Sequence, residues 1–346
     1  MSAAGPVRIE RLDRGIKVRC DDIYAIASWR EIAYLAGPRA ACLVFLLVFP
    51  ALGSVVGRYW QLVYLIALAM ALMSMSWDLL ASVGLVSLGH SLFFAAGAYV
   101  AGYVDLQLGW PLAASIATGT LVGAALSTLL LAPTLRLRGV YFGLLTFAAP
   151  LLGMRIIEAT KILGGTEGLT GLDPFPNLMV EQYLLLAAVL ACVFGFQHLL
   201  GSDYGLVLRA IRENDRSVLA SGIPIHWFKT QAVFLAALPA CLAGSVLAHH
   251  YQVVGMSAFS LDYSLLSLTA AMVGGQGSPA GAALGAFLLV PVSELMRAFG
   301  TLRVVVYSLV LVLFIVLLPE GIFHYLRRKY QQFERPVPLG EAGRGG

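Results

Sequence analysis

The chain has 346 residues and a net charge of +4; 59% of its residues are hydrophobic and only 12% are charged. A soluble globular domain carries about 25% charged residues, so this chain lacks the polar surface that a water-soluble body of its size needs. Its mean hydropathy of +0.82 suits a lipid environment, where outward side chains are apolar. The composition predicts an all-α integral membrane protein and argues against a nucleic-acid-binding domain.

The two ends of the chain differ from its middle. Residues 1–37 mix basic and acidic side chains and lack the short apolar core of a secretory signal peptide. Residues 38–320 hold the long apolar stretches, and residues 321–346 are again polar. We therefore expect one transmembrane domain between an N-terminal and a C-terminal cytoplasmic tail.

Long apolar stretches predict the membrane spans, because a helix that crosses the hydrocarbon core needs about 20 mostly apolar residues. Ten such stretches occur, at 40–57, 59–80, 83–104, 111–133, 139–158, 181–200, 229–250, 263–279, 280–297 and 301–318. Glycines and polar residues interrupt the third, the eighth and the ninth of these stretches.

The positions of Lys and Arg predict the orientation, since basic residues concentrate in short cytoplasmic loops. They gather in the N-terminal tail, in the loop 201–228 and in the C-terminal tail, with a smaller group at Arg136 and Arg138. An even number of predicted spans separates each region from the next. Ten spans with both termini in the cytoplasm satisfy this pattern. The loop 159–180, rich in glycine and proline, then lies outside.

The first interrupted stretch, Gly84–Tyr99, places three glycines and a histidine at membrane depth. Irregular backbone there is tolerated only where it is buried in protein or lines a wet cavity. One interpretation is a broken helix beside a translocation pathway, with Ser87, Gly89 and His90 as pathway candidates. The alternative is tight helix packing through small residues. Asp78, near the end of the preceding span, either caps a helix or faces the same pathway.

A second interrupted stretch, Val273–Gly285, lies at a corresponding place in the second half of the chain. Both stretches begin with Val-Gly, and paired interruptions of this kind indicate an internal repeat with a pathway at its interface. Gly274 and Gly275 are therefore further candidates for the translocation pathway.

The same stretch contains three glycines spaced by four residues, at Gly277, Gly281 and Gly285. Pro279 suits the first turn of a helix. The spacing predicts that the three glycines share one helix face and let another helix approach closely. We expect this face to have a packing role.

The basic stretch 203–224 has apolar residues at helical spacing and ends with Gly222 and Pro224, a typical helix stop. A short amphipathic cytoplasmic helix of this kind suits a groove on a soluble partner. The candidate residues for coupling to that partner are Arg209, Ile211, Arg212, Glu213 and Gly222. The alternative is an ordinary basic loop that obeys the positive-inside rule.

Several motifs that carry chemistry are missing from the sequence. It has no G-x-x-x-x-G-K-[ST] phosphate loop, so it cannot bind and hydrolyse ATP in that way. It also has no H-E-x-x-H, no G-x-S-x-G and no C-x-x-C pair. We therefore predict no catalytic residues, no metal site and no cofactor held by this chain.

Taken together, these segments resemble the LivM-type inner-membrane permeases of branched-chain amino acid ABC importers, a family that also includes urea permeases. The matching blocks are Gly84–Tyr99, Leu135–Phe142, Gly164–Gly171, Arg209–Asn214, Gly274–Ser278 and Pro319–Gly321. They cover roughly residues 60–322, and the resemblance depends on their order. Asp78 departs from the family pattern, where Asn is usual, and the 203–224 stretch matches only loosely.

The resemblance implies a type II importer fold and a role as the translocation subunit of a bacterial-type plasma membrane transporter. The expected partners are a second permease, two cytoplasmic ATPase subunits that bind ATP and Mg²⁺, and an extracytoplasmic binding protein. Branched-chain amino acids lead as substrate, with urea or short amides as an alternative. An ion-coupled secondary transporter is the competing class, although such proteins usually display more intramembrane acids.

Overall fold

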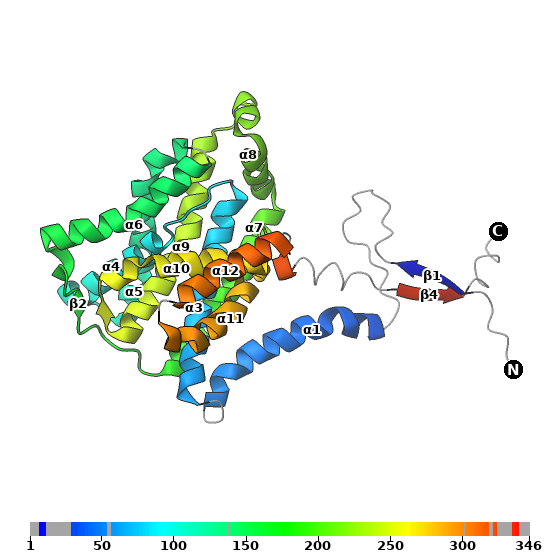
Figure 1. Cartoon of the computed structure of the whole chain (residues 1–346), viewed down its shortest axis with the longest axis horizontal. Helices are drawn as coiled ribbons and strands as arrows, with labels where there is room; N and C mark the ends of the chain where they lie inside the picture. The colour runs from blue at the N-terminus through cyan, green and yellow to red at the C-terminus, as the bar shows by residue number, and fades with distance from the viewer. Residues whose placement is uncertain are drawn as a thin grey trace.

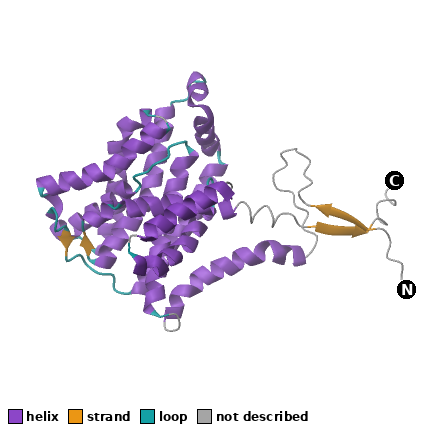
Figure 2. Ribbon diagram, viewed as in Figure 1, coloured by secondary structure: helices purple, strands orange, loops and turns teal. Residues whose placement is uncertain are grey.

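The protein is described by a computed structural model, which covers residues 7–11, 29–53, 57–137, 139–300, 302–317, 321–323 and 334–338. Helices make up most of this part of the chain (Figure 1, Figure 2). Six helical segments are long and apolar enough to cross a bilayer: Arg58–Ser82, Leu112–Arg136, Val140–Thr160, Leu178–Gly201, Ile225–Tyr251 and Met256–Gly274. The predicted class, a helical integral membrane protein, is confirmed.

The α-helices follow one another along the chain with short connections. They are α1 (Trp29–Val48), α3 (Arg58–Ser82), α4 (Ser91–Leu108), α5 (Leu112–Leu131), α6 (Val140–Thr160), α7 (Leu178–Gly201), α8 (Asp203–Ala220), α9 (Ile225–Tyr251), α10 (Leu261–Gly274), α11 (Pro279–Leu295) and α12 (Leu302–Leu317). Short 3₁₀ turns join several of them, among them η1 (Phe49–Leu52) and η4 (Met256–Phe259).

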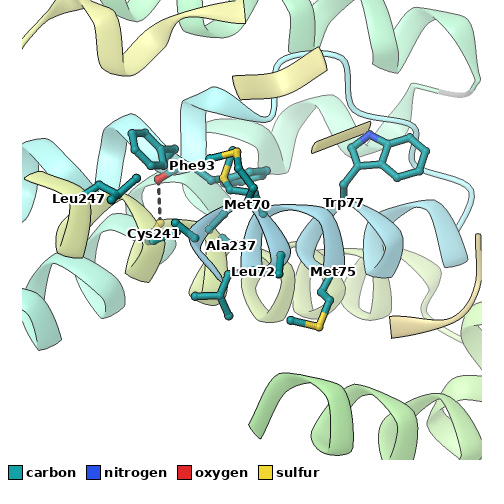
Figure 3. Close-up of a cluster of buried hydrophobic side chains, with 14 of the residues drawn as sticks. Met70, Leu72, Met75, Trp77, Phe93, Ala237, Cys241 and Leu247 are labelled. Carbon is teal, nitrogen blue, oxygen red and sulfur yellow. Dashed lines mark hydrogen bonds between the residues drawn. The ribbon is translucent and has the colours of Figure 1, made fainter. Parts of the chain in front are cut away.

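Helix α3 forms the centre of the bundle (Figure 1). Nearly all of its residues from Gln61 to Ser82 are buried, and it packs on α7, α9, α10 and α11. A helix that is apolar on every side must be covered on every side, which explains its central place. Figure 3 shows the side chains of Met70, Leu72 and Met75 within this buried cluster.

Small residues bring α4, α5 and α9 into close contact. A Cβ at Gly97 of α4 would overlap the backbone of Cys241 on α9, and a Cβ at Gly244 would overlap the Phe94 carbonyl. The Cys241 thiol donates to the Phe93 carbonyl at 3.1 Å (Figure 3). Close backbone approach of this kind is how membrane helices gain packing contacts.

The two ends of the bundle are structurally different. One end carries α8, which lies at the upper right of the bundle in Figure 1. At the opposite end, β2 (Leu169–Thr170) pairs antiparallel with β3 (Val253–Val254) and ties the loop after α6 to the end of α9. We refer to these as the α8 end and the β2–β3 end.

Helices α1 and α6 lie at the periphery. In Figure 1, α1 slants away from the bundle. Beyond it, β1 (Val7–Arg11) pairs antiparallel with β4 (Glu334–Pro338), so the two tails meet. The sequence patterns did not predict this pairing.

Most predicted spans agree with the helices to within about five residues, and two differ in a way that has a physical cause. Helix α4 begins at Ser91 rather than 83, because the glycines before it leave the backbone unwound. Helix α1 begins at Trp29, inside the stretch assigned to the polar tail, because hydropathy alone does not detect a polar helical start.

Candidate functional site

The unwound segment, residues 83–90, separates α3 from α4 inside the bundle. Gly84 has a φ of 80°, a left-handed conformation that glycine adopts without strain. The amides of Val83, Gly84 and Leu85 still bond back to the last turn of α3. Helix α3 therefore ends at Ser82, Val83 and Gly84 form the turn that follows it, and the chain continues as irregular backbone to Ser91.

Side chains from two helices satisfy backbone groups that the unwound segment leaves free. The indole Nε1 of Trp77 donates to the Ser87 carbonyl at 2.7 Å, and the amide of Leu88 donates to the Thr146 hydroxyl at 3.1 Å. Gly89 lies so close to α6 that a Cβ there would overlap the Thr146 carbonyl. Because no water is available in the hydrocarbon region, these bonds stabilise the break.

His90 is fully buried between the unwound segment and α3. Its Nε2 lies 2.7 Å from the Ser76 hydroxyl, which itself donates to the Ala236 carbonyl. Since the serine proton is already used, the histidine must donate from Nε2, which places its proton there. Its Nδ1 has no hydrogen-bond partner.

The start of α4 is tied to the second half of the chain. The amide of Ser91 donates to the hydroxyl of Ser264 on α10 at 2.8 Å. The Ser91 hydroxyl donates to the Phe259 carbonyl in η4 at 3.2 Å. The unwound segment is therefore held from three sides, by α3, α6 and the η4–α10 region.

Asp78 lies at the α8 end of α3 and is completely buried. Its Oδ1 accepts a hydrogen bond of 2.6 Å from the amide of Gly277, in the turn between α10 and α11. Its Oδ2 has no partner. Asp78, which precedes the first interrupted stretch, therefore links α3 to the second interrupted stretch.

The six predicted pathway residues fall into two groups inside the chain. Ser87, Gly89 and His90 lie between α3 and α6, whereas Asp78 contacts the turn that Gly274 and Gly275 begin; all six are buried. In this state of the single chain they form internal contacts between helices.

The glycine-rich stretch builds a tight hairpin of α10 and α11. A Cβ at Gly285 would overlap the Ala270 carbonyl, and one at Gly281 would lie 3.0 Å from the Gly274 oxygen. Gly277 does not share this face: it lies in the turn before α11, and a Cβ there would meet nothing within 4 Å. The predicted three-glycine face therefore contains two glycines, because the helix begins only at Pro279.

Helix α8 is two helical pieces joined at Asn214, whose φ of −155° and ψ of 92° are not helical. The Asn214 side chain accepts a hydrogen bond from the Ser217 amide at 3.2 Å, as an N-cap residue does. Asp215 then pairs with the buried Lys229 of α9 at 3.7 Å. The second piece is thus anchored to the bundle independently of the first.

Ile211, one of the candidate residues for coupling to a partner, does not face outward in the single chain. Ile211 is 3% exposed and packs in a small cluster with Val83, Leu208, Val218 and Ile225. The amphipathic pattern of α8 reflects burial against the chain itself. The remaining coupling candidates, Arg209, Arg212, Glu213 and Gly222, are exposed at the α8 end.

Three polar contacts at the β2–β3 end were not predicted. His250 of α9 lies 2.9 Å from the buried carboxylate of Glu181 on α7. Asp105 accepts from the Asp173 amide at 2.9 Å, and His249 Nδ1 lies 2.9 Å from the Asp173 carbonyl. In the sequence, these contacts were indicated only by the two adjacent histidines, His249 and His250, which point to different sides of a helix. They contact different elements, and among the described residues no group of three or more His, Cys, Asp or Glu residues is placed to hold a metal.

The fold and its interrupted helices define a multispanning helical membrane protein with two linked halves. Residues 61–318 match the family described as the permease component of the branched-chain amino acid transport system. Because the match covers most of the chain, the protein belongs to this family.

The chain is also similar to individual proteins. It is 28% identical over 275 residues to the high-affinity branched-chain amino acid transport permease LivM of Salmonella typhimurium and to that of Escherichia coli, covering 70% of this chain and 65% of each relative. A LivM protein described as probable, from Methanocaldococcus jannaschii, is 25% identical over 54% of this chain and 56% of the relative. PsaBC from Streptococcus pneumoniae, in complex with Fab, superposes with a TM-score of 0.45 at 13% identity, over 82% of this chain and 99% of that chain.

Proposed function

We propose that this chain is the permease subunit of an ABC importer that carries branched-chain amino acids, or a related small polar solute, across a bacterial-type plasma membrane. The observation that carries the proposal is the family match over residues 61–318. The names of the LivM relatives support the substrate class. ATP and Mg²⁺ would bind separate ATPase subunits, since the sequence has no phosphate loop.

Ten membrane spans with both termini in the cytoplasm are part of this proposal. The alternation of helix ends supports it: α3 ends beside α8, whereas α9 begins beside α8 and ends at β3. Helix α10 then ends at the Asp78 contact, which lies at the α8 end. The basic residues of the 201–228 loop support an orientation with the α8 end inside the cell.

A second permease subunit would cover the outer face of α6. This helix contacts the unwound segment through Gly143 and Thr146, yet Val140 and Tyr141 are 75% and 73% exposed. A large apolar surface that the chain itself does not cover faces lipid or a partner. We propose that the second subunit binds the outer face of α6, because the inner face of α6 contacts the unwound segment that holds the candidate pathway residues.

The exposed side of α8 would receive an ATPase subunit. Arg209, Arg212 and Glu213 offer charged contacts on the first piece of the helix, and Gly222 ends the second with a φ of 81°. The Asp215–Lys229 pair and the Ile211 cluster would transmit displacement of α8 to α9 and α3. A rigid element shared by two states is the usual basis of such coupling.

Reconstitution into vesicles tests the function directly. We expect uptake of labelled leucine to require ATP, the matching ATPase pair, the second permease and the binding protein together. Uptake by this chain alone, driven by an ion gradient, would make it a secondary transporter. ATP-driven uptake of urea with no uptake of leucine would select the alternative substrate.

Cysteine labelling tests the orientation separately. In a cysteine-free background, Ser217→Cys should resist an impermeant reagent applied to whole cells, whereas Glu167→Cys in the 159–180 loop should react. Labelling of Ser217→Cys under these conditions would overturn the proposed orientation.

A further inference from the structure

Only one of the two oxygens of the buried Asp78 carboxylate has a hydrogen-bond partner. Its Oδ1 accepts from the Gly277 amide at 2.6 Å, while its Oδ2 has no hydrogen-bond partner and no access to solvent. A buried carboxylate oxygen is stabilised only by a donor or a positive charge. The Oδ2 of Asp78 can therefore accept a hydrogen bond from a donor that lies elsewhere in the present state.

Helix α8 packs directly beside this acid. A Cβ at Gly84, just past the end of α3, would lie 3.4 Å from the Arg212 Cα and 3.5 Å from its Cγ. Any side chain at Gly84 would also require a strained backbone, since its φ is 80°. Arg212 is near enough to interact electrostatically with the Asp78 carboxylate, although burial has the larger effect on that group and the two side chains form no ion pair in this state. Arg212 is at the same time exposed, so its guanidinium is not fixed by packing.

The turn held by Asp78 connects several other elements. Gly277 lies between α10 and α11, whose backbones touch at Gly274 and Gly281. A Cβ at Gly321 would lie 2.6 Å from the Gly275 nitrogen, so the segment after α12 also rests on this turn. Movement of the Gly277 amide would therefore displace the α10–α11 hairpin.

We propose that Asp78 is a positioning residue for energy coupling: Arg212 engages its free oxygen when an ATPase subunit moves α8, and the Gly277 hydrogen bond passes that movement to the α10–α11 hairpin. This inference rests on the proposed function. It gives α8 a route into the second half of the chain that is separate from the Ile211 cluster and the Asp215–Lys229 pair. Neither of those contacts involves the Gly277 turn.

A structural role and a coupling role make different predictions for Asp78→Asn. The amide oxygen of asparagine still accepts from the Gly277 amide, so the hydrogen bond that holds the turn is retained. The negative charge that attracts Arg212 is lost. The variant should therefore fold and bind the ATPase while it transports less substrate for each ATP hydrolysed.

The experiment measures leucine transported per ATP hydrolysed by the full complex in proteoliposomes, beside thermal stability and ATPase co-purification. We expect this ratio to fall about tenfold in Asp78→Asn and in Arg212→Gln, with no further fall in the double variant, since both remove one interaction. Arg212→Lys should recover part of the ratio because it restores the charge. Arg216→Gln, an exposed neutralisation on the same helix, is the matched control and should keep the ratio.

Several results would overturn the proposal. A normal ratio in Asp78→Asn, additive losses in the double variant, or an equal loss in Arg216→Gln would each exclude an Arg212–Asp78 interaction. If Asp78→Asn does not fold, the exposed Arg212→Gln still decides, because an unchanged ratio there refutes the inference. If the wild-type complex shows no ATP-driven uptake of any tested solute, the proposed function fails and this inference fails with it.

Discussion

The contact between α4 and α9 gives the sharpest stability prediction, because one substitution has opposite effects at two helical glycines. Gly244 of α9 faces the backbone of α4, where an added Cβ would lie 2.8 Å from the Phe94 carbonyl carbon and 3.1 Å from its Cα. The same Cβ would overlap the Phe94 carbonyl oxygen, and optimal carbon–carbon contacts are about 3.5–4.0 Å, so α4 and α9 would have to separate by about 1 Å or more. Gly195 of α7 has nothing within 4 Å of the same position.

The magnitudes decide the sign at each site. Overpacking a close contact costs about 1–3 kcal/mol, and the upper part of that range applies to Gly244 because backbone atoms cannot rotate aside. Replacing glycine by alanine in a helix contributes at most about 1 kcal/mol in the other direction. Gly244→Ala should therefore lose about 2 kcal/mol of unfolding free energy, whereas Gly195→Ala should be neutral or slightly stabilised.

The assay is the SDS concentration at which the purified chain unfolds from mild detergent micelles. Gly244→Ala should unfold at a clearly lower SDS fraction than wild type, and Gly195→Ala at the same or a higher fraction. Equal behaviour of the two variants would refute the close α4–α9 contact as a source of stability.

Three further predictions use other contacts. Ile211→Asp should destabilise the chain by more than about 2 kcal/mol because the site is buried. Leu219 is 54% exposed, so Leu219→Asp should have the melting temperature of the wild type; equal melting temperatures for the two variants would mean that Ile211 is not buried. Gly281→Leu should reduce the yield of folded monomer in size-exclusion chromatography, and an unchanged yield would mean that the α10–α11 contact tolerates bulk. His250→Ala should cost about 1–3 kcal/mol by leaving the Glu181 carboxylate unpaired, and adding Glu181→Gln should recover part of the loss in the same melting assay.

Hydropathy predicted the helices well because lipid imposes one simple requirement on each span. The expected stretch 59–80 corresponds to α3, and 229–250 to α9, with differences of a few residues. Hydropathy does not show which other helix, if any, covers each face of a given helix. Helix α3 and helix α6 have similar mean hydropathy, 1.8 and 1.7, yet one is the buried centre and the other is mostly exposed. That difference depends on contacts between distant parts of the chain.

Only the local features of the candidate site could be predicted from the sequence, because its contacts also join distant parts of the chain. Glycines at membrane depth indicated the unwound segment, and Asp78, which precedes the first Val-Gly pair, accepts a hydrogen bond from Gly277 in the second stretch. Periodicity also showed that α8 has an apolar face. It could not show that this face, including Ile211, packs on Val83 rather than on another protein, because both arrangements bury the same residues. The glycines Gly97 and Gly244 carried no recognisable spacing, since their contact joins two helices far apart in sequence.

The unwound segment also constrains how the protein is made. The side chains that accept hydrogen bonds from the Leu88 and Ser91 amides emerge late from the ribosome: Thr146 follows Leu88 by 58 residues, and Ser264 follows Ser91 by 173. When the translocon releases α3 and α4, these backbone amides have no partner within the finished part of the chain. Membrane insertion and final folding are therefore separate events here, and the break acquires its native geometry only after α10 has been synthesised. Truncated nascent chains that end before residue 264 should accordingly expose this segment to proteases or chaperones that the complete chain excludes.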